Sequence, residues 1–167
     1  DANLNLQEIE YHAFRWCHSL KEVSLPKSLQ RLNEIFYMCI NLETINIAAG
    51  SKLTSIREKA FSTNPKLKAF NFLGDCDLVR IEKNVFAGLR ELQSFTIPKP
   101  VRFIESNAFI GCASMKTVKF HPDAEIAEIG AGAFADCGIT SINIPAKVVK
   151  IEREAFLKCE ALHTINI

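Results

Sequence analysis

Apolar residues recur along this chain in one template that is repeated seven times. A phenylalanine marks each copy, and successive phenylalanines are 22 to 25 residues apart: Phe14, Phe36, Phe61, Phe86, Phe109, Phe134 and Phe156. An isoleucine lies five residues before six of these rings, and Leu32 lies four before Phe36. An alternating apolar pair closes each copy, as in Val23-x-Leu25. Such self-similarity at a fixed period is the signature of a stacked-repeat protein.

Each copy is predicted to contain two short strands joined by a tight turn. The closing pair alternates with a period of two, which is typical of a strand with one buried face. The apolar segment before each phenylalanine predicts a second, shorter extended piece. The AFxxC stretch between the two is too short for a full helix, so we expect a tight turn or a single 3₁₀ turn there. Prolines follow four closing pairs by one or two residues, where a strand must stop: Pro26, Pro98, Pro122 and Pro145.

The copies must stack, because a unit of about 23 residues cannot bury its own apolar side. We therefore expect one domain over 1–167, an α/β-type repeat solenoid of predominantly short parallel strands with little true helix. Its seven units are 6–28, 29–52, 53–77, 78–100, 101–125, 126–147 and 148–167. At about 4.8 Å between strands, six intervals predict one parallel sheet roughly 29 Å long. The phenylalanines would form a column inside it.

Cysteine is concentrated at one template position, three residues after the phenylalanine. Five of the six cysteines lie there: Cys17, Cys39, Cys112, Cys137 and Cys159. Stacking would align them as buried thiols, each a weak hydrogen-bond donor to a carbonyl of the turn that has no other partner. Asn64 occupies the same position in its unit, and its amide would donate a stronger hydrogen bond there. Disulfides between stacked neighbours are the alternative, although ladder geometry rarely suits them. Cys76 lies off the template, so we expect it to be the most exposed thiol.

The pattern I-x-x-x-AF-x-x-C-x-x-L-x-x-I-x-I resembles the BspA-like, treponemal-type leucine-rich repeats. It is spelled here IESNAFIGCASMKTVKF and IEREAFLKCEALHTINI, and the resemblance covers the chain from Leu6 to Ile167. Departures occur at Ile35, Asn64 and Leu89. The resemblance implies a curved right-handed solenoid, found mostly in secreted or surface-attached proteins associated with adhesion. Because neither terminal unit looks like a polar cap, we expect the chain to be a fragment of a longer array.

Catalytic and cofactor motifs are missing from the template. The four histidines lie at different template positions in three units, and no GxSxG, HExxH or phosphate-loop motif occurs. The EIGAGAF stretch around Gly130 lacks GxGxxG spacing and belongs to a repeat. Zinc is not expected, since no Cys/His ligand spacing occurs. Three aligned acids, Glu82, Glu105 and Glu152, follow the template isoleucine and are interpreted as a solvated face. We therefore predict no enzyme and no cofactor.

Bulk composition supplies little evidence about partners. The formal charge is +1, from 20 Lys and Arg against 19 Asp and Glu, which gives no electrostatic argument for nucleic acid. No apolar run approaches the ~18 residues that a membrane span requires. We therefore expect no nucleic-acid partner and no membrane insertion by this segment. The family resemblance implies a protein partner, either a host or matrix protein or another cell-surface protein, and the sequence leaves its identity and the oligomeric state open.

The residues that point outward from the closing strands form the predicted binding face. Most are Ser, Thr or Asn, and a row before the strands adds lysines that would make the face mildly basic. The predicted residues are Lys21, Glu22, Ser24, Thr44, Asn46, Lys68, Asn71, Ser94, Thr96, Lys116, Thr117, Lys119, Ser141, Asn143, His163 and Thr164. A plain solvated sheet face is the alternative interpretation. The near absence of Tyr and Trp argues against a very tight hot spot.

These observations lead to two hypotheses about function. The first is a non-catalytic protein-binding or adhesion module of a secreted or cell-surface protein, with the ligand docked on a concave sheet. The second is a spacer or assembly scaffold that acts through its ends or edges. The hypotheses differ in whether substitutions on the sheet face or in the terminal units abolish function.

Overall fold

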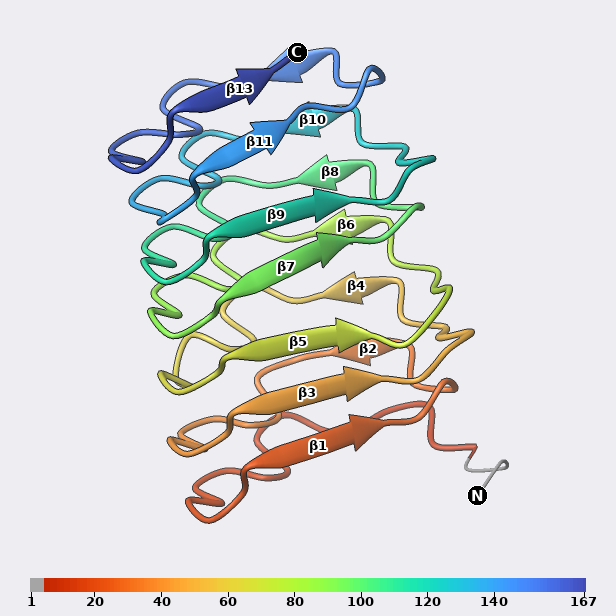
Figure 1. Ribbon diagram of the computed structural model, residues 1–167. Coiled ribbons are helices and arrows are strands. Elements are labelled where there is room, and N and C mark those ends of the chain that lie inside the picture. The colour runs from red at the N-terminus through yellow and green to blue at the C-terminus, as the bar shows by residue number, and fades with distance from the viewer. Residues whose placement is uncertain (1–4) are drawn as a thin grey trace.

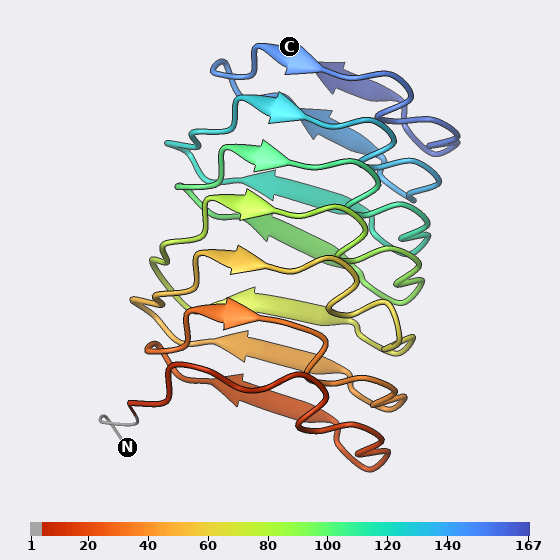
Figure 2. The ribbon, with the colours of Figure 1, turned by 180° about the vertical axis from the view of Figure 1, so that it is seen from behind.

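The computed structural model describes residues 5–167 as a right-handed β-solenoid with no helix in that range (Figure 1). Each turn runs along a long strand, returns along a short one and rises toward the C-terminus (Figures 1 and 2). The long strands are β1 (Glu22–Leu25), β3 (Thr44–Ile47), β5 (Ala69–Phe72), β7 (Ser94–Ile97), β9 (Thr117–Phe120), β11 (Ser141–Asn143) and β13 (Thr164–Asn166). The predicted fold class, with its short parallel strands and tight turns, is confirmed.

The short strands form the back of the solenoid as one continuous parallel sheet. They are β2 (Arg31–Leu32), β4 (Ser55–Ile56), β6 (Arg80–Ile81), β8 (Phe103–Ile104), β10 (Glu128–Ile129) and β12 (Lys150–Ile151). The order β12-β10-β8-β6-β4-β2 follows the chain, so each strand pairs with its counterpart one unit away. The first unit is extended around Ile9 without a strand assigned there.

The long strands do not form the single sheet that the sequence predicted. They pair as β1-β3-β5 and as β13-β11-β9-β7, so the ladder is interrupted between β5 and β7. Register follows the template within each half, as in Ile45 opposite Phe70 and Phe95 opposite Val118. Where β5 approaches β7, one main-chain bond remains at the start of the strands, from Gln93 N–H to the Lys68 carbonyl at 3.2 Å.

Phenylalanine rings stack in the interior in two runs, Phe14 with Phe36 and Phe61 through Phe156, so the single column that was expected is interrupted between Phe36 and Phe61. Ring centroids of successive template residues are 5.6 Å apart for Phe61 and Phe86, and 5.0 Å apart for Phe86 and Phe109. Phe109 and Phe134 follow at 5.3 Å. At about 1.5–3 kcal/mol for each fully buried ring, this column contributes strongly to stability. Phe14 in the first unit is 41% exposed, since no ring lies below it among the described residues.

Each template phenylalanine is flanked by backbone with positive φ, a feature that the apolar pattern did not predict. Two residues after the ring, Gly88, Gly111 and Lys158 have φ of 75°, 76° and 54°. Two residues before it, Asn107 and Gly132 have φ of 58° and 62°. Glycine and asparagine suit this left-handed region, whereas lysine is strained there. Gly132 of the EIGAGAF stretch is therefore a turn residue of a repeat, whereas Gly130 lies against the backbone of the preceding unit, where an added Cβ would be 2.7 Å from the Ser106 nitrogen.

The cysteine prediction is confirmed for four of the five aligned thiols and is wrong for Cys76. Cys39, Cys112, Cys137 and Cys159 are buried, and all six cysteines are free. Cys76 is buried because residues 75–77 fold back onto the preceding unit, where Ser51 and Cys76 form a parallel bridge. Cys17 is the exposed thiol. Burial raises the pKa of the Cys39, Cys76 and Cys159 thiols, and a hydrogen bond with Cys112 raises that of Cys137.

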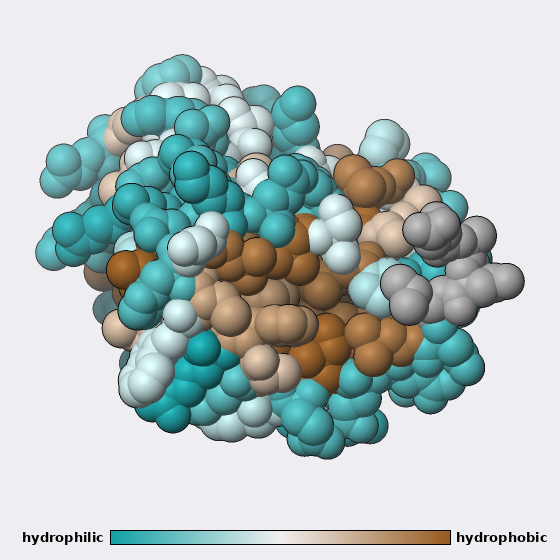
Figure 3. Space-filling view, turned by 90° about the horizontal axis from the view of Figure 1, so that it is seen from below, coloured by the Kyte–Doolittle hydropathy of each residue, from teal (hydrophilic) through white to brown (hydrophobic). Residues whose placement is uncertain are grey.

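Apolar surface is open at the two terminal units. Seen from the N-terminal end, apolar side chains gather in the middle of the surface (Figure 3). Trp16 is 57% exposed, and the Arg15 guanidinium lies 4.2 Å from its ring centroid. In the last unit Ile165 is 46% exposed.

Candidate binding surface

The predicted binding residues all lie along one face of the solenoid, which we call the long-strand face. It consists of the outward side chains of the seven long strands together with the residue that precedes each strand. Thr44, Asn46 and Lys68 are half-buried, and the other thirteen predicted residues are exposed. Outward residues of paired strands are in register, as Glu22 with Thr44 and Thr96 with Lys119. Rows of side chains therefore cross the strands, as the repeat pattern predicted.

Asparagine side chains on this face form hydrogen-bonded ladders. Asn71 Nδ2 donates to Asn46 Oδ1 at 3.0 Å, and Asn46 Nδ2 donates to Glu22 Oε1 at 2.8 Å. In the last units Asn166 Nδ2 donates to Asn143 Oδ1 at 2.6 Å. These bonds hold the asparagine side chains of the face in fixed orientations.

Lysine charge on the long-strand face is partly neutralised. Lys68 Nζ lies 2.9 Å from Glu43 Oε2 and 4.0 Å from Glu91 Oε2. Its hydrogen bond with Glu43 raises the pKa of Lys68 and lowers that of Glu43. Within residues 5–167, the lysines of this face without a carboxylate within 4.0 Å are Lys21, Lys116 and Lys119. Two of these three, Lys116 and Lys119, lie next to and within β9, so the unpaired positive charge of the face is greatest there.

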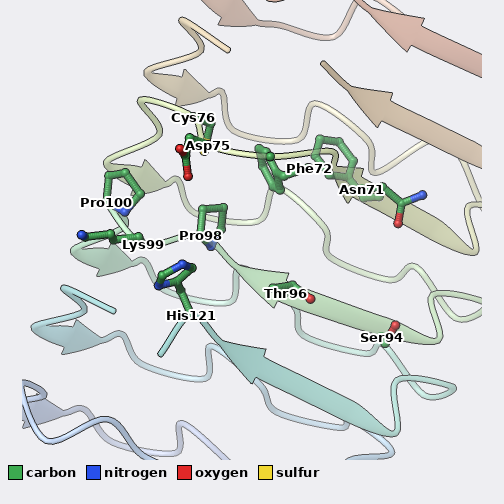
Figure 4. Close-up of a pocket in the computed structure, with 12 residues that line it drawn as sticks. Asn71, Phe72, Asp75, Cys76, Ser94, Thr96, Pro98, Lys99, Pro100 and His121 are labelled. Atoms are coloured by element: carbon green, nitrogen blue, oxygen red, sulfur yellow. The ribbon is translucent and has the colours of Figure 1, made fainter. Parts of the chain in front are cut away.

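A cleft of about 500 Å³ lies where β5 and β7 separate (Figure 4). Phe72 and Asn71 come from β5, and Ser94 and Thr96 come from β7. Phe70, Gly74, Asp75, Cys76, Pro98, Lys99, Pro100 and His121 complete its wall. Of these residues, Asn71, Ser94 and Thr96 were predicted from the sequence. The others were not, because they are apolar residues of β5 or lie in the connections that follow the strands. The feature of the sequence that could have indicated this cleft is Pro98, which immediately follows β7.

A second opening of about 440 Å³ lies between β9 and β11, lined by residues of both strands and by Pro145. Pairing there is reduced to Ser141 opposite Thr117. Both openings therefore lie where the long-strand ladder is weakened.

The aligned acids belong to the back of the solenoid and have a structural role. Glu82, Glu105 and Glu152 each accept a main-chain N–H from the unit before: Glu58 N at 3.2 Å, Lys83 N at 3.2 Å and Ala131 N at 3.0 Å. Arg80 also donates to Glu105 at 2.6 Å. Within residues 5–167 no group of three or more metal-ligating side chains could hold an ion, and no helix is long and apolar enough to cross a membrane.

The family of this chain follows from comparison with known proteins. The model of the BspA type leucine rich repeat region matches residues 2–79 and 79–167. The chain therefore belongs to the BspA-type leucine-rich repeat family, whose repeats commonly mediate protein binding. A comparison with curated proteins returned no match.

Solved structures of bacterial leucine-rich repeat proteins share the fold. A Treponema pallidum leucine-rich repeat protein superimposes with a TM-score of 0.79 and 25% identity, covering 91% of this chain and 72% of the other. A leucine-rich cell-surface protein of Faecalibacterium prausnitzii gives a TM-score of 0.69 and 28% identity over 87% of this chain. This chain spans 38% of that protein's length. A Bacteroides ovatus protein, at 20% identity and a TM-score of 0.56, covers 97% of this chain and 53% of its own.

Proposed function

We propose that this chain is a non-catalytic protein-binding module, acting in adhesion as part of a secreted or cell-surface protein, and that its partner docks on the long-strand face. The observation that carries the proposal is the in-register array of short polar side chains along that face, ordered by the asparagine ladders. The Faecalibacterium prausnitzii relative is described as a cell-surface protein, which supports the proposed location.

The geometry favours moderate affinity and a broad contact. Ser, Thr and Asn supply many hydrogen-bonding groups, while the long-strand face holds no Trp or Tyr anchor. Such a surface obtains its affinity from summed polar contacts and from the steering charge of Lys116 and Lys119.

Charge reversal at β9 tests this proposal. The variant Lys116→Glu with Lys119→Glu is compared with Lys27→Glu with Lys147→Glu, which makes the same charge change off the face. Each protein is immobilised and exposed to host-cell and extracellular-matrix extracts, and the retained proteins are identified and then titrated in purified form. We expect a partner that binds the wild type and the control but is lost by the β9 variant. Equal capture by all three would contradict docking on this face.

The scaffold hypothesis has its own supporting observation, the apolar surface of the terminal units. Trp16 and Ile165 are 57% and 46% exposed, and another repeat unit stacked on either end would cover them. Light scattering of the wild type and of Trp16→Ser with Ile165→Ser separates the two functions. A concentration-dependent assembly that these substitutions abolish would favour the scaffold.

A further inference from the structure

Proline occupies the position that closes the long-strand ladder in other units. His121, the residue after β9, donates its N–H to the Ile97 carbonyl at 3.0 Å. Pro98 and Pro145 hold the equivalent position in the fourth and sixth units, and proline has no N–H to donate. The ladder is interrupted before Pro98, between β5 and β7, and is weakened before Pro145, between β9 and β11.

The opening between β9 and β11 brings two outward side chains of the long-strand face together. The two strands lie side by side (Figure 1), and their remaining residue pair is Thr117 with Ser141. Lys119 and Asn143 are two residues further along each strand and line the opening. Because side chains alternate between the two faces of a strand, Lys119 and Asn143 point outward in one row.

An asparagine ladder that starts in the last unit ends at this opening. Asn166 Nδ2 donates to Asn143 Oδ1 at 2.6 Å, so the Asn143 amide has its oxygen toward β13 and its Nδ2 toward β9. The next side chain of the row is Lys119, whose ammonium is also a donor and cannot accept. Within residues 5–167, neither Asn143 Nδ2 nor Lys119 Nζ has a hydrogen-bond or ion-pair partner.

The first units show how such a ladder is completed. There Asn71 Nδ2 donates to Asn46 Oδ1 at 3.0 Å, and Asn46 Nδ2 donates to Glu22 Oε1 at 2.8 Å. A carboxylate of the chain itself therefore accepts the last amide N–H of the first ladder. The second ladder has no such acceptor, since Lys119 follows Asn143 in the row.

Donors and positive charge surround the opening between β9 and β11. Lys119 is joined there by His121, whose Nδ1 accepts the Asp123 N–H at 3.0 Å and whose Nε2 is therefore a donor. The Asp123 carboxylate itself lies 3.8 Å from the Lys99 ammonium. No Asp or Glu is among the described residues that line the opening. The opening therefore offers a cation and several N–H and O–H donors without an acidic acceptor.

We propose that this opening binds the side-chain carboxylate of an Asp or Glu of the protein partner. The carboxylate oxygens accept from Asn143 Nδ2 and Lys119 Nζ, and they complete the second ladder as Glu22 completes the first. Lys119 and Asn143 are exposed, so the carboxylate approaches from the outer side of the face and the strands need not move apart. This inference rests on the proposed function and adds the chemistry that the partner contributes.

A single carboxylate is favoured over a polyanion because the long-strand face has few free cations. Nucleic acid or a sulfated polysaccharide would need a row of cations, one for each phosphate or sulfate group that is contacted. Within residues 5–167, the lysines of this face without a carboxylate within 4.0 Å are Lys116 and Lys119 near β9 and Lys21 in the first unit. One carboxylate needs one cation and a few donors, which the opening supplies.

The probe for the test is the blocked pentapeptide acetyl-STETS-amide, which carries one carboxylate and is titrated into ¹⁵N-labelled protein at constant ionic strength. The matched probe acetyl-STQTS-amide has glutamine in place of the glutamate. We expect the largest shift changes at the side-chain amide of Asn143 and at the main-chain amide of Lys119. The glutamine probe should bind roughly tenfold more weakly, because the charge-assisted hydrogen bonds are lost. Equal affinity of the two probes, or an unchanged Asn143 side-chain signal, would overturn the proposal.

A sulfated sugar could supply a negative charge of a different source and is titrated in parallel. A monosulfated glucose carries one negative charge, like the glutamate probe. We expect it to bind more weakly than the glutamate probe or not at all. Tighter binding of the sugar at Asn143 would assign the opening to a sulfated glycan and overturn the proposal.

Asparagine variants supply the matched control. Asn143→Asp places a carboxylate of the chain itself beside Lys119, so the glutamate probe should bind at least roughly tenfold more weakly. Asn71→Asp makes the same change at the equivalent position of the first ladder and should leave probe affinity unchanged. Both residues are exposed, so neither change disturbs the core. Probe affinity that is the same in the wild type and in Asn143→Asp would contradict the assignment.

The failure of this inference can be told apart from the failure of the proposed function. If the glutamate probe does not bind while partner capture still depends on Lys116 and Lys119, the carboxylate site is lost and docking on the face stands. If the probe binds as expected while partner capture ignores the two lysines, the carboxylate site stands and docking of the captured partner around β9 is lost.

Discussion

The thiol of Cys112 donates a hydrogen bond to the carbonyl oxygen of Phe86, 3.2 Å away in the preceding unit. The same bond joins Cys137 to Phe109 at 3.1 Å and Cys159 to Phe134 at 3.0 Å. Asn64 replaces the thiol with an amide and reaches the Phe36 carbonyl at 2.9 Å. Cysteine and asparagine at this template position therefore share one role, donation to a buried carbonyl, whereas Leu89 at the same position has no donor.

Loss of the hydrogen-bond donor at this position should lower the free energy of unfolding only where the residue is buried inside the stack. We expect Cys112→Ala to lower the free energy of unfolding by about 1–2 kcal/mol, because a buried carbonyl loses its partner and a small cavity forms. Cys17→Ala, in the exposed first unit, should change it by less than about 0.5 kcal/mol. Urea unfolding of both variants measures the difference, and equal effects would show that the bond contributes nothing.

Thiol labelling distinguishes the cysteines by burial. Cys17 is exposed, whereas the other five are buried and free. A maleimide should modify the native protein once and rapidly, and the modified peptide should contain Cys17. Rapid modification of Cys76 would contradict the folded-back position of residues 75–77.

Replacing a phenylalanine of the column should lower the free energy of unfolding most in the middle units. Phe109 is fully buried between two stacked rings, so we expect Phe109→Ala to cost about 3–5 kcal/mol. Phe14→Ala removes a ring that is 41% exposed and stacks on one side only, so its cost should be well below that. A urea midpoint unchanged by Phe109→Ala would refute the column as a source of stability.

Glycine should be favoured two residues after each ring. Lys158, with φ of 54°, is a lysine in a position that Gly111 occupies with φ of 76°. Lys158→Gly should stabilise the protein by about 0.5–1 kcal/mol, since relief of strain exceeds the entropy that glycine loses. Gly111→Ala should destabilise it by about 1–2 kcal/mol. Opposite signs in thermal unfolding are the expected result, and equal signs would contradict the strain argument.

Acid should weaken the back of the solenoid. The Lys150 ammonium, and then the Ala131 N–H, lower the pKa of Glu152 below its usual value of 4.5. A depressed pKa gives stability that is complete above the unfolded-state pKa and is lost as pH falls through the folded-state pKa. Glu152→Gln should therefore lose less stability than the wild type between pH 7 and pH values below about 4.

The control for this prediction is Glu160→Gln, which removes a carboxylate that forms no ion pair in residues 5–167. Urea midpoints at the two pH values should separate it from Glu152→Gln. An acid dependence that is the same in the wild type and in Glu152→Gln would show that this carboxylate contributes no pH-linked stability.

The sequence by itself determined the repeat, its two strands and the direction of each side chain. A period of 22 to 25 residues places Phe14 through Phe156 in one column, and strand alternation points Thr96 outward and Phe95 inward whatever the neighbours are. The same argument identified the thiols that donate to buried carbonyls. These features recur from unit to unit, so the sequence contains several copies of the pattern that predicts them.

Features that occur in one unit and are not repeated could be located only from the tertiary structure. Cys76 lies off the template, and only the bridge with Ser51 showed that it is buried. In the sequence, Pro98 predicted the end of a strand. Its effect on the hydrogen-bond ladder depends on which carbonyl of the neighbouring strand lies opposite, and the sequence does not give that. The cleft joins Phe72, Pro98 and His121 from three consecutive units. A repeat pattern describes equivalent residues and not contacts between unlike ones, so the three-dimensional register alone reveals where the ladder opens.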